Sequence, residues 1–425
     1  MPPSLSWHGL PSRATRRSRA RAQLDLMGAF RRPEGATHTS PGQRPISANL
    51  FIDITGKISE FGNMATHNAA DEEWQTLVNF LPVNWKIMAQ QSGALKGLRQ
   101  DKSVENYLRV LLLHVGCGLS LRETAARAGQ SGLAELSDVA VLKRLRKSKE
   151  WLRQMCEAMF PDQVAPGGID AHSLRLVDST LVREPGPTGS LWRIHYSLRW
   201  PQLSCDGFKL TAREGKGNGE SLEHYALRKG ERVLADRGYC RAGDIHYAAA
   251  RGAEVLVRFN PDGIRIEDAD GQRFALLKHL KALSKAGQSR EWPVQVPLEG
   301  QAAVPARLCV IRKTRAAIRL SIEKLQREAS KDQRTLKPET LRYAEYVMVL
   351  TTFPAEAFPT QQVLETYRFR WQVELLFKRV KQHAELGHLP KNDEQSSQAW
   401  LYGKMLVALL TEKLLAHARD FSPWG

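Results

Sequence analysis

The segment YRFRWQVELLFKRVK, residues 367–381, would carry a charged stripe beside an apolar one if it formed a helix. At about 100° per residue, Tyr367, Arg370, Glu374 and Lys381 fall within about 60° of arc. The adjoining stripe would pack on a core; it consists of Phe369, Val373, Leu376, Phe377 and Val380. We therefore expect a helix that presents one carboxylate, two bases and a phenol. The alternative is a solvated face, where an Arg370–Glu374 pair adds a few tenths of a kcal/mol.

Two further carboxylates lie in or directly after apolar strand patterns. Asp178 stands inside LRLVDSTLV, where aspartate is disfavoured and an unpaired buried carboxylate is costly. Asp236 ends the pattern RVLAD and precedes an Arg-Gly-Tyr turn. Taken singly, Asp178 could bond a neighbouring backbone group at a strand end, and Asp236 could simply start a turn.

Together with Glu374, the two aspartates form a candidate metal-binding set. Carboxylate oxygens are hard ligands that suit Mg²⁺ or Mn²⁺. Two such ions about 3.5–4 Å apart can activate an attacking oxygen and stabilise a leaving one at phosphorus. Tyr367, Arg370 and Lys381 would bind phosphate nearby, because carboxylates alone would repel a polyanion. The pattern therefore favours phosphodiester chemistry.

The surrounding sequence alternates strand and helix patterns, which indicates a mixed α/β layer structure. Strands are expected at 174–182, 191–200, 207–215, 231–235, 253–260 and 344–353, and helices at 221–230, 242–252, 360–384 and 396–418. Residues 260–342 break this rhythm with short strands and a basic helix. The simplest arrangement is one α/β domain interrupted by an inserted subdomain. Residues 307–342 hold eleven basic residues against four acids, which would suit DNA backbone contacts or a solvated face.

Residues 71–165 are expected to be helical. The expected caps are a capping box of Ser120 with Glu123, a stop at Gly129, and Ser137 at the start of the next helix. That second helix is basic and carries Lys143 and Arg144. Two short helices with a tight connection suit a helix-turn-helix in a DNA groove. The alternative is an ordinary structural helix pair.

Composition narrows the class of protein. The 425 residues carry 62 Lys and Arg against 45 Asp and Glu, a formal charge of +17, and 42% are hydrophobic. That excludes a wholly disordered or collagen-like chain, and no apolar run reaches the roughly 18 residues that span a bilayer. The basic excess favours nucleic acid as partner over a merely basic surface. Five separated cysteines without a CxxC pair indicate reduced thiols in a cytoplasmic protein.

Residues 1–63 look unlike the rest. Residues 1–35 hold seven Arg against Asp25 and Glu34, and Pro, Ser and Gly interrupt any period. Such a leader imitates an organellar transit peptide. Two other interpretations compete: a flexible basic arm, or sequence translated from a start codon assigned too early. The early start codon is favoured, because ordered patterning begins at Met64.

The spacing Y-x2-R-x3-E-x6-K, met here as Tyr367, Arg370, Glu374 and Lys381, resembles the signature of one family. That family is the DDE transposases of bacterial insertion sequences, in the large group conventionally numbered four. The Asp of VDST, the Asp of ADRGY, the segment GNGESLEHY and the insertion before the glutamate resemble it as well. The resemblance covers roughly residues 75–415.

The resemblance implies an α/β fold: an RNase H-like catalytic domain interrupted by a mostly β insertion subdomain, with a helical N-terminal DNA-binding region. Asp178, Asp236 and Glu374 would then be catalytic and hold two Mg²⁺ ions, for which Mn²⁺ can substitute. The implied activity is nicking at terminal inverted repeats and transfer of the freed 3′-hydroxyl into target DNA, with a hairpin on the transposon end.

The resemblance also implies partners and further DNA-binding residues. The partner would be double-stranded DNA, both transposon ends and target, with a homodimer in the synaptic complex, no membrane, and a place at the bacterial nucleoid. The DNA-binding residues would be Tyr367, Arg370, Lys381, Arg258, Trp292, Lys143 and Arg144. Trp292 could stack on a flipped base or pack the small β subdomain. Arg258 could contact phosphate or cap its strand.

Six segments are expected along the chain. They are a disordered basic leader (1–63), a helical DNA-binding region (64–165), the first part of the catalytic domain (166–260), the insertion (261–342), the second part of the catalytic domain with the Glu374 helix (343–392) and a C-terminal helix (393–425). Two other functions stay open. One is a two-metal nuclease that cuts without joining. The other is a non-catalytic DNA-binding relative, against which the intact Asp178, Asp236 and Glu374 argue.

Overall fold

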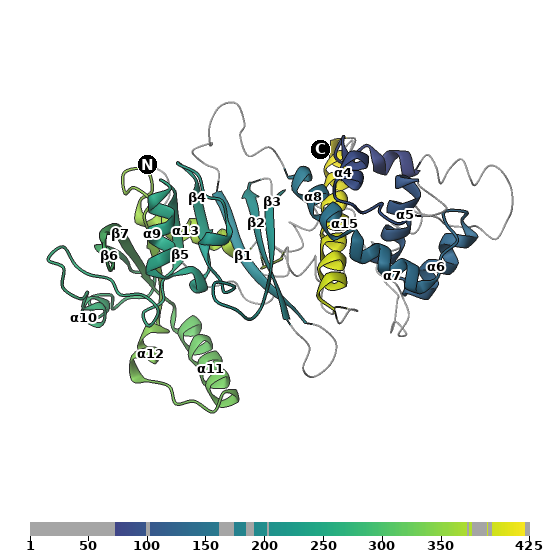
Figure 1. Ribbon diagram of the computed structural model, residues 1–425. Coiled ribbons are helices and arrows are strands. Elements are labelled where there is room, and N and C mark those ends of the chain that lie inside the picture. Colours follow the sequence, from purple (N-terminus) through teal and green to yellow (C-terminus); the bar gives the residue numbers. More distant parts are fainter. Residues whose placement is uncertain are drawn as a thin grey trace. The chain divides into compact units, whose positions relative to one another are not determined.

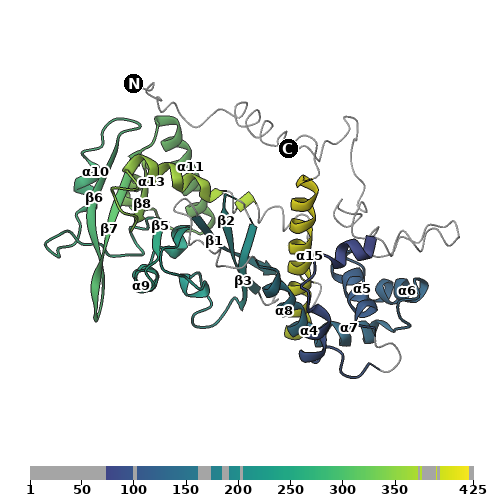
Figure 2. The same cartoon turned by 90° about the horizontal axis from the view of Figure 1, so that it is seen from above.

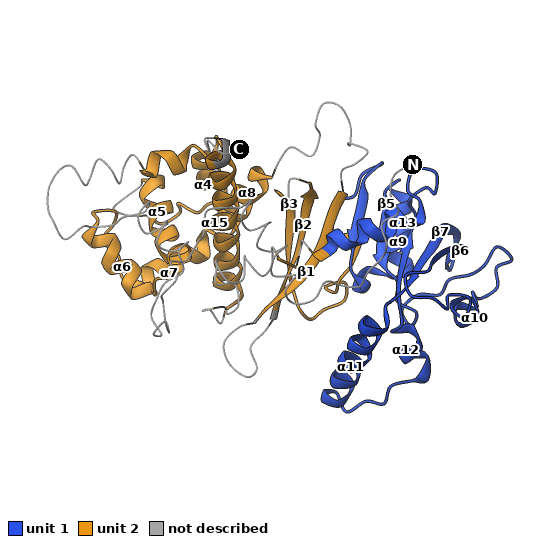
Figure 3. Cartoon of the chain, turned by 180° about the vertical axis from the view of Figure 1, so that it is seen from behind, with its two compact units in different colours: residues 1–43, 227–370 blue, residues 44–226, 371–425 orange. Residues whose placement is uncertain are grey.

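The computed structural model describes residues 73–98, 103–160, 174–183, 191–201, 204–371, 374–375, 389 and 393–420. The leader 1–63 and Lys381 lie outside the described residues. The chain forms two compact units, coloured separately in Figure 3: unit 1, residues 1–43 and 227–370, and unit 2, residues 44–226 and 371–425.

The helices of unit 2 are present where the sequence predicted a helical region (Figure 1). They are α4 Trp85–Gln91, α5 Val104–Val115, α6 Leu121–Gln130, α7 Asp138–Lys147, α8 Lys149–Met159 and α15 Glu394–Asp420. The capping box of Ser120 with Glu123 is confirmed, as is the Ser137 cap. The predicted stop at Gly129 is wrong. Helix α6 continues through it, and Gly132 instead takes the left-handed conformation with φ +66.

Aromatic side chains and one glycine hold these helices together. The Trp151 ring stacks with Trp85 and Tyr107, with centroids 6.2 and 5.7 Å apart. The Trp151 indole N–H also donates to the Trp85 carbonyl over 2.9 Å, which satisfies its buried donor. A Cβ at Gly403 of α15 would lie 3.0 Å from Val115 of α5. Glycine therefore permits the close approach of these two helices.

The strands of unit 2 follow the predicted pattern. They are β1 Leu174–Arg183, β2 Leu191–Trp200 and β3 Ser204–Ala212, paired antiparallel with β2 between the other two. The helix predicted at 221–230 is wrong, since the described segment holds only the 3₁₀ turn η1 Leu222–His224. Long-range bonds explain the difference. Arg175 donates to the Ala226 carbonyl and the Tyr225 hydroxyl donates to the Asp178 carbonyl, so this segment lies along β1.

Unit 1 is a sheet with helices on both faces. Its elements are β4 Arg232–Ala235, η2 Arg237–Tyr239, α9 Ala242–Ala250, β5 Glu254–Arg258, α10 Leu276–Leu280, β6 Ser289–Leu298, β7 Gln301–Arg312, α11 Arg315–Lys331, α12 Pro338–Tyr343, β8 Tyr346–Thr351, α13 Thr360–Tyr367 and η3 Arg368–Arg370. The strand order is β4-β5-β8-β7-β6, with β4 and β5 parallel and the other pairs antiparallel. Figure 2 shows α9 and α13 on opposite faces of this sheet.

The segment expected to be an insertion, 261–342, holds strands and helices. Its hairpin β6–β7 extends the sheet, because β7 pairs with β8. Helix α11 reaches away from the strands (Figure 1) and buries only Ala329. The five cysteines are free, as the sequence predicted, and the structure places all five in buried positions. Among the described residues, no helix has the length and apolar character needed to cross a membrane.

The helix predicted from 360 to 384 is not one continuous α-helix. Helix α13 ends at Tyr367 and the 3₁₀ turn η3 follows, after which helical residues appear again at 371 and 374–375. A 3₁₀ turn advances about 120° per residue instead of 100°. The common helix face calculated for an unbroken helix therefore does not hold beyond Arg370.

A buried carboxyl group joins α15 to the sheet of unit 2. Glu412 accepts hydrogen bonds from the Tyr196 hydroxyl, at 3.3 Å, and the Cys205 backbone N–H, at 3.4 Å. Burial raises the pKa of Glu412 from 4.5 to about 7, although both hydrogen bonds act against the rise. The folded protein therefore keeps this proton between about pH 4.5 and 7, whereas the unfolded chain loses it.

Glu412→Gln is expected to stabilise the protein at pH 8 and to change its stability little at pH 4.5. The carboxylate costs the folded wild type up to about 3 kcal/mol once the pH exceeds the folded-state pKa, and a neutral amide avoids that cost. Urea unfolding between pH 4.5 and 8 measures the difference, with the exposed Glu299→Gln as control. A stability difference that stays constant with pH would contradict the assignment.

Candidate active site

Asp236 and Arg258 are neighbours because of strand pairing. Strands β4 and β5 run parallel with Ala235 opposite Val257. Asp236 and Arg258 come next in each chain segment, at the carboxyl ends of the two strands. Those ends meet at one edge of the sheet, which is where open α/β sheets bind ligands. The sequence had named both residues but had no way to show that they are adjacent.

The Asp236 carboxylate is directed at the C-terminal end of α13 and η3. It stands at the N-cap position of η2 but caps none of its N–H groups. Instead, the Tyr367 hydroxyl donates to its Oδ1 over 3.4 Å, and Arg370 Nη1 lies 3.7 Å from its Oδ2. The Asp236 side chain remains 43% exposed. An aspartate that only starts a turn accepts hydrogen bonds from backbone N–H groups of that turn. The contacts of Asp236 with distant side chains instead favour a functional site.

The surroundings of Asp236 are strongly positive. Arg258 and Arg370 act electrostatically with it and with Tyr367, and Arg237 lies close enough to oppose the charge on Arg258. Burial lowers the pKa of Arg258 below its ordinary value, but a guanidinium stays protonated in proteins. Burial also raises the pKa of the Tyr367 phenol, and Asp236 adds to the rise. Tyr367 is therefore a neutral donor in a site that can attract an anion.

Asp178 lies within β1 of unit 2, opposite Tyr196, and is half-buried. Its Oδ1 accepts from the Ser179 backbone N–H over 2.8 Å, and its carbonyl accepts from Tyr225 over 2.8 Å. Tyr225 is only 3% exposed. The backbone at Asp178 is therefore held both by strand pairing with β2 and by the hydrogen bond from Tyr225.

A second contact ties the same segment to β1. The Ser179 hydroxyl donates to Glu220 over 3.2 Å, and Arg193 of β2 donates to both of them, over 2.8 and 3.2 Å. The sequence pattern GNGESLEHY predicted no role for Glu220 or Tyr225, and no pattern marked Arg193. Their spacing carried no chemical signal, because their partners are on strands far away in the sequence.

Glu374 lies in unit 2 on a helical residue pair and is exposed. Asp178 is in unit 2 as well, whereas Asp236, Arg258, Tyr367 and Arg370 are in unit 1. Within the described ranges, no three His, Cys, Asp or Glu side chains form a group that could hold a metal ion. The donor chemistry nevertheless suits a hard divalent cation, since Asp178, Asp236 and Glu374 offer oxygen ligands.

The remaining predicted residues lie elsewhere. Trp292 on β6 is half-buried, with its ring centroid 5.3 Å from His279 and 6.1 Å from Phe274. Lys143 and Arg144 are on α7, where Lys143 is exposed and Arg144 partly so.

Comparison with known proteins gives consistent matches. Residues 170–410 match the family described as the transposase DDE domain. The chain is 31% identical over 364 residues to the putative transposase InsL for insertion sequence element IS186A of Escherichia coli K12, a match that covers 84% of this chain and 97% of that protein. The transposase for insertion sequence element IS421 of Escherichia coli is 31% identical over 365 residues, with the same coverage. The transposase for IS231F of Bacillus thuringiensis subsp. israelensis is 22% identical over 275 residues, 58% of this chain and 57% of that protein.

Tyr225→Phe is expected to lower the free energy of unfolding by about 1 kcal/mol, because it removes the donor to the Asp178 carbonyl and leaves the ring in place. Urea unfolding measures the loss, and Tyr343→Phe serves as a control on a half-buried phenol. Equal stability of the Tyr225→Phe variant and the wild type would contradict a structural role for this hydrogen bond.

Proposed function

Because this chain belongs to the DDE transposase family, we propose that it binds the terminal inverted repeats of an insertion sequence and moves that element by cutting and joining DNA strands. The observation that carries the proposal is the cluster of Arg258, Tyr367 and Arg370 around Asp236. In such a cluster the carboxylate could bind a metal cation, and the guanidinium groups beside it could bind an anionic substrate. The proposed chemistry is phosphodiester hydrolysis followed by transesterification.

We propose that Asp178, Asp236 and Glu374 hold two Mg²⁺ ions, with Mn²⁺ as a substitute. Bound there, the ions would supply an activated attacking oxygen and would stabilise the leaving oxygen at phosphorus. Metal ions could reach both Asp236, whose side chain is half-exposed, and Glu374, which is exposed. The fold around them would be RNase H-like, with residues 261–342 as its insertion.

The protein's own side chains would bind and orient the DNA. Arg370 offers a planar fork to a phosphate, and Tyr367 offers a neutral hydroxyl donor. Arg258 is half-buried and interacts electrostatically with Tyr367, Asp236 and Arg370, so its charge would add to the attraction for a bound phosphate. Lys381 is proposed to extend this basic surface.

Other contacts are proposed away from the carboxylates. Lys143 and Arg144 would bind repeat DNA, and a homodimer would hold two ends together. A hairpin would form on the transposon end, and a flipped base would stack on the ring of Trp292, which is half-buried beside His279 and Phe274. The proposed place of action is the bacterial nucleoid, where the DNA partner is found.

Asp178→Ala, Asp236→Ala and Glu374→Ala are each expected to abolish cleavage of a repeat end and to leave binding of intact repeat DNA within about threefold. Cleavage needs the carboxylates, whereas binding depends mainly on basic contacts. Gel-shift and cleavage assays in Mg²⁺ measure the two effects separately. The exposed Asp270→Ala is the matched control. Full cleavage by any of the three variants would refute that residue's role.

Arg370→Ala is expected to slow cleavage of bound DNA by about tenfold or more, and Arg370→Lys should restore little, because an ammonium cannot form a bidentate fork on phosphate. The neighbouring exposed Arg368→Ala is the control. The assay compares full-length ends with ends shortened at the cleavage site. Equal weakening of binding to both ends, with an unchanged rate for bound DNA, would mean that Arg370 contributes only general electrostatics.

A further inference from the structure

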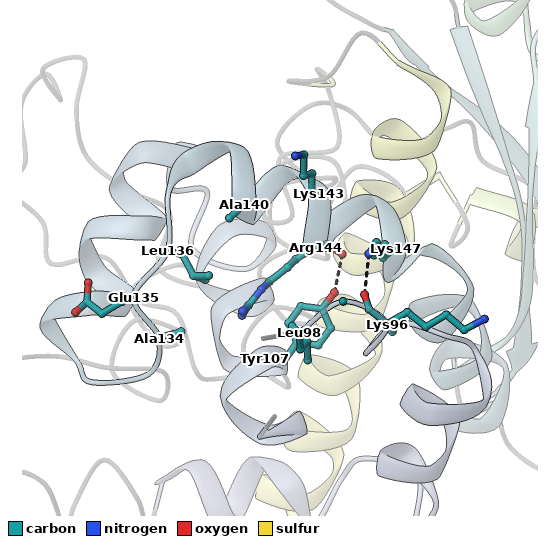
Figure 4. Close-up of a pocket in the computed structure, with 12 residues that line it drawn as sticks. Lys96, Leu98, Tyr107, Ala134, Glu135, Leu136, Ala140, Lys143, Arg144 and Lys147 are labelled. Atoms are coloured by element: carbon teal, nitrogen blue, oxygen red, sulfur yellow. Dashed lines mark hydrogen bonds between the residues drawn. The ribbon is translucent and has the colours of Figure 1, made fainter. Parts of the chain in front are cut away.

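A pocket of about 330 Å³ opens in unit 2 between α7 and the turn at residues 94–98 (Figure 4). Its cationic lining residues are Lys96, Lys143, Arg144 and Lys147, against the single acid Glu135. Figure 4 shows Glu135 at the opposite end of the pocket from Lys143 and Lys147. The rest of the lining is apolar or aromatic. The pocket therefore combines a positive rim with an apolar wall.

The wall at the 94–98 turn is fixed by Lys147. Its Nζ donates to the Lys96 carbonyl over 2.7 Å. A Cβ at Gly97, whose φ is +82, would lie 3.1 Å from the same Nζ. Glycine thus allows both the turn and this close approach. An ammonium has three donors, so Lys147 keeps two for a ligand after its bond to the turn.

The floor of the pocket is the Tyr107 ring with Arg144 over it. The guanidinium carbon of Arg144 lies 5.3 Å from the ring centroid. The Tyr107 hydroxyl donates to the Arg144 carbonyl over 2.8 Å and accepts from Ser148 over 2.8 Å. Burial raises the pKa of Tyr107 to about 12, so the phenol stays neutral. The hydrogen bonds tie Tyr107 to the backbone of α7, and the guanidinium of Arg144 lies over its ring.

Helix α7 continues the pocket as an exposed stripe. Val139, Lys143 and Lys147 recur every four residues and are exposed, whereas Val141 and Leu145 are fully buried. Val139 is 55% exposed near the N-terminus of α7. In the proposed complex this valine could contact a thymine methyl group.

We propose that this pocket binds one sugar-phosphate unit of duplex DNA. The phosphate would contact Lys143 and Lys147, and the deoxyribose would lie against Leu98, Leu136 and Ala140, with the N-terminal turn of α7 facing the adjacent major groove. The pocket is too small for a duplex, and its apolar wall gives a bare inorganic anion no advantage. The proposal rests on the proposed function and specifies where the repeat is held.

The test is a scan of repeat duplexes in which single phosphates are replaced by neutral methylphosphonates, with binding to the full-length protein measured by fluorescence anisotropy. For the wild type, one neutral position should weaken binding by about fivefold. Lys143→Ala should weaken binding to unmodified DNA by a similar factor and lower the salt slope by about one. At that same position, the methylphosphonate should weaken DNA binding by Lys143→Ala by less than a further twofold, because the lysine that contacts the phosphate is already absent.

Lys86→Ala is the matched control, because it removes one exposed lysine of the same unit that pairs with Glu105 outside the pocket. It should keep the full methylphosphonate effect. Equal losses for Lys143→Ala and the wild type at every position would overturn the pocket assignment while repeat binding, and with it the proposed function, survives. Failure of the wild type to prefer repeat DNA would instead refute the proposed function and the pocket together.

A second arm separates DNA from free nucleotides. Deoxynucleoside monophosphates at about 1 mM should not raise the melting temperature of the wild type, because the proposed ligand needs the neighbouring duplex contacts along α7. A rise that disappears in Lys143→Ala, combined with unchanged DNA binding by that variant, would identify a small-nucleotide site and overturn the assignment to DNA.

Discussion

The parallel pairing of β4 with β5 is the interaction on which the arrangement around Asp236 depends. Because Ala235 lies opposite Val257, a carboxylate and a guanidinium leave the sheet side by side. Helix α13 packs its buried face on the same sheet and ends there, which brings Tyr367 and Arg370 to the Asp236 carboxylate. The buried apolar strands fix these positions, since a one-residue slip would turn every side chain to the other face.

Exposure and contact length distinguish the Asp236 cluster from an ordinary structural ion pair. The ion pair of Asp206 with Arg175 and Arg199 is almost fully buried, with contacts of 3.1 and 2.6 Å. Such a group specifies packing. Asp236 is half-exposed and its contacts are longer, at 3.4 Å to the Tyr367 hydroxyl and 3.7 Å to Arg370 Nη1. Loose contacts around an accessible carboxylate leave it able to exchange partners, which a reactive site requires.

The segment between β3 and β4 is hydrogen-bonded to the backbone and side chains of β1. Glu220 and Tyr225 bond to Ser179 and to the Asp178 carbonyl. In unit 2, α7 carries a different kind of surface, in which Lys143 and Lys147 border an apolar wall.

The sequence by itself determined the residue chemistry and the local elements. Helix α5, the capping box at Ser120 and strand β1 follow from periodicity and capping, which act over a few residues. Tertiary structure decided the rest, because the partners come from distant segments. It broke the helix after Tyr367, held 221–230 extended through Tyr225, and joined Arg258 to Asp236. It also brought the Lys147 ammonium of α7 to the Lys96 carbonyl, 51 residues away in the sequence, which no local pattern could reveal.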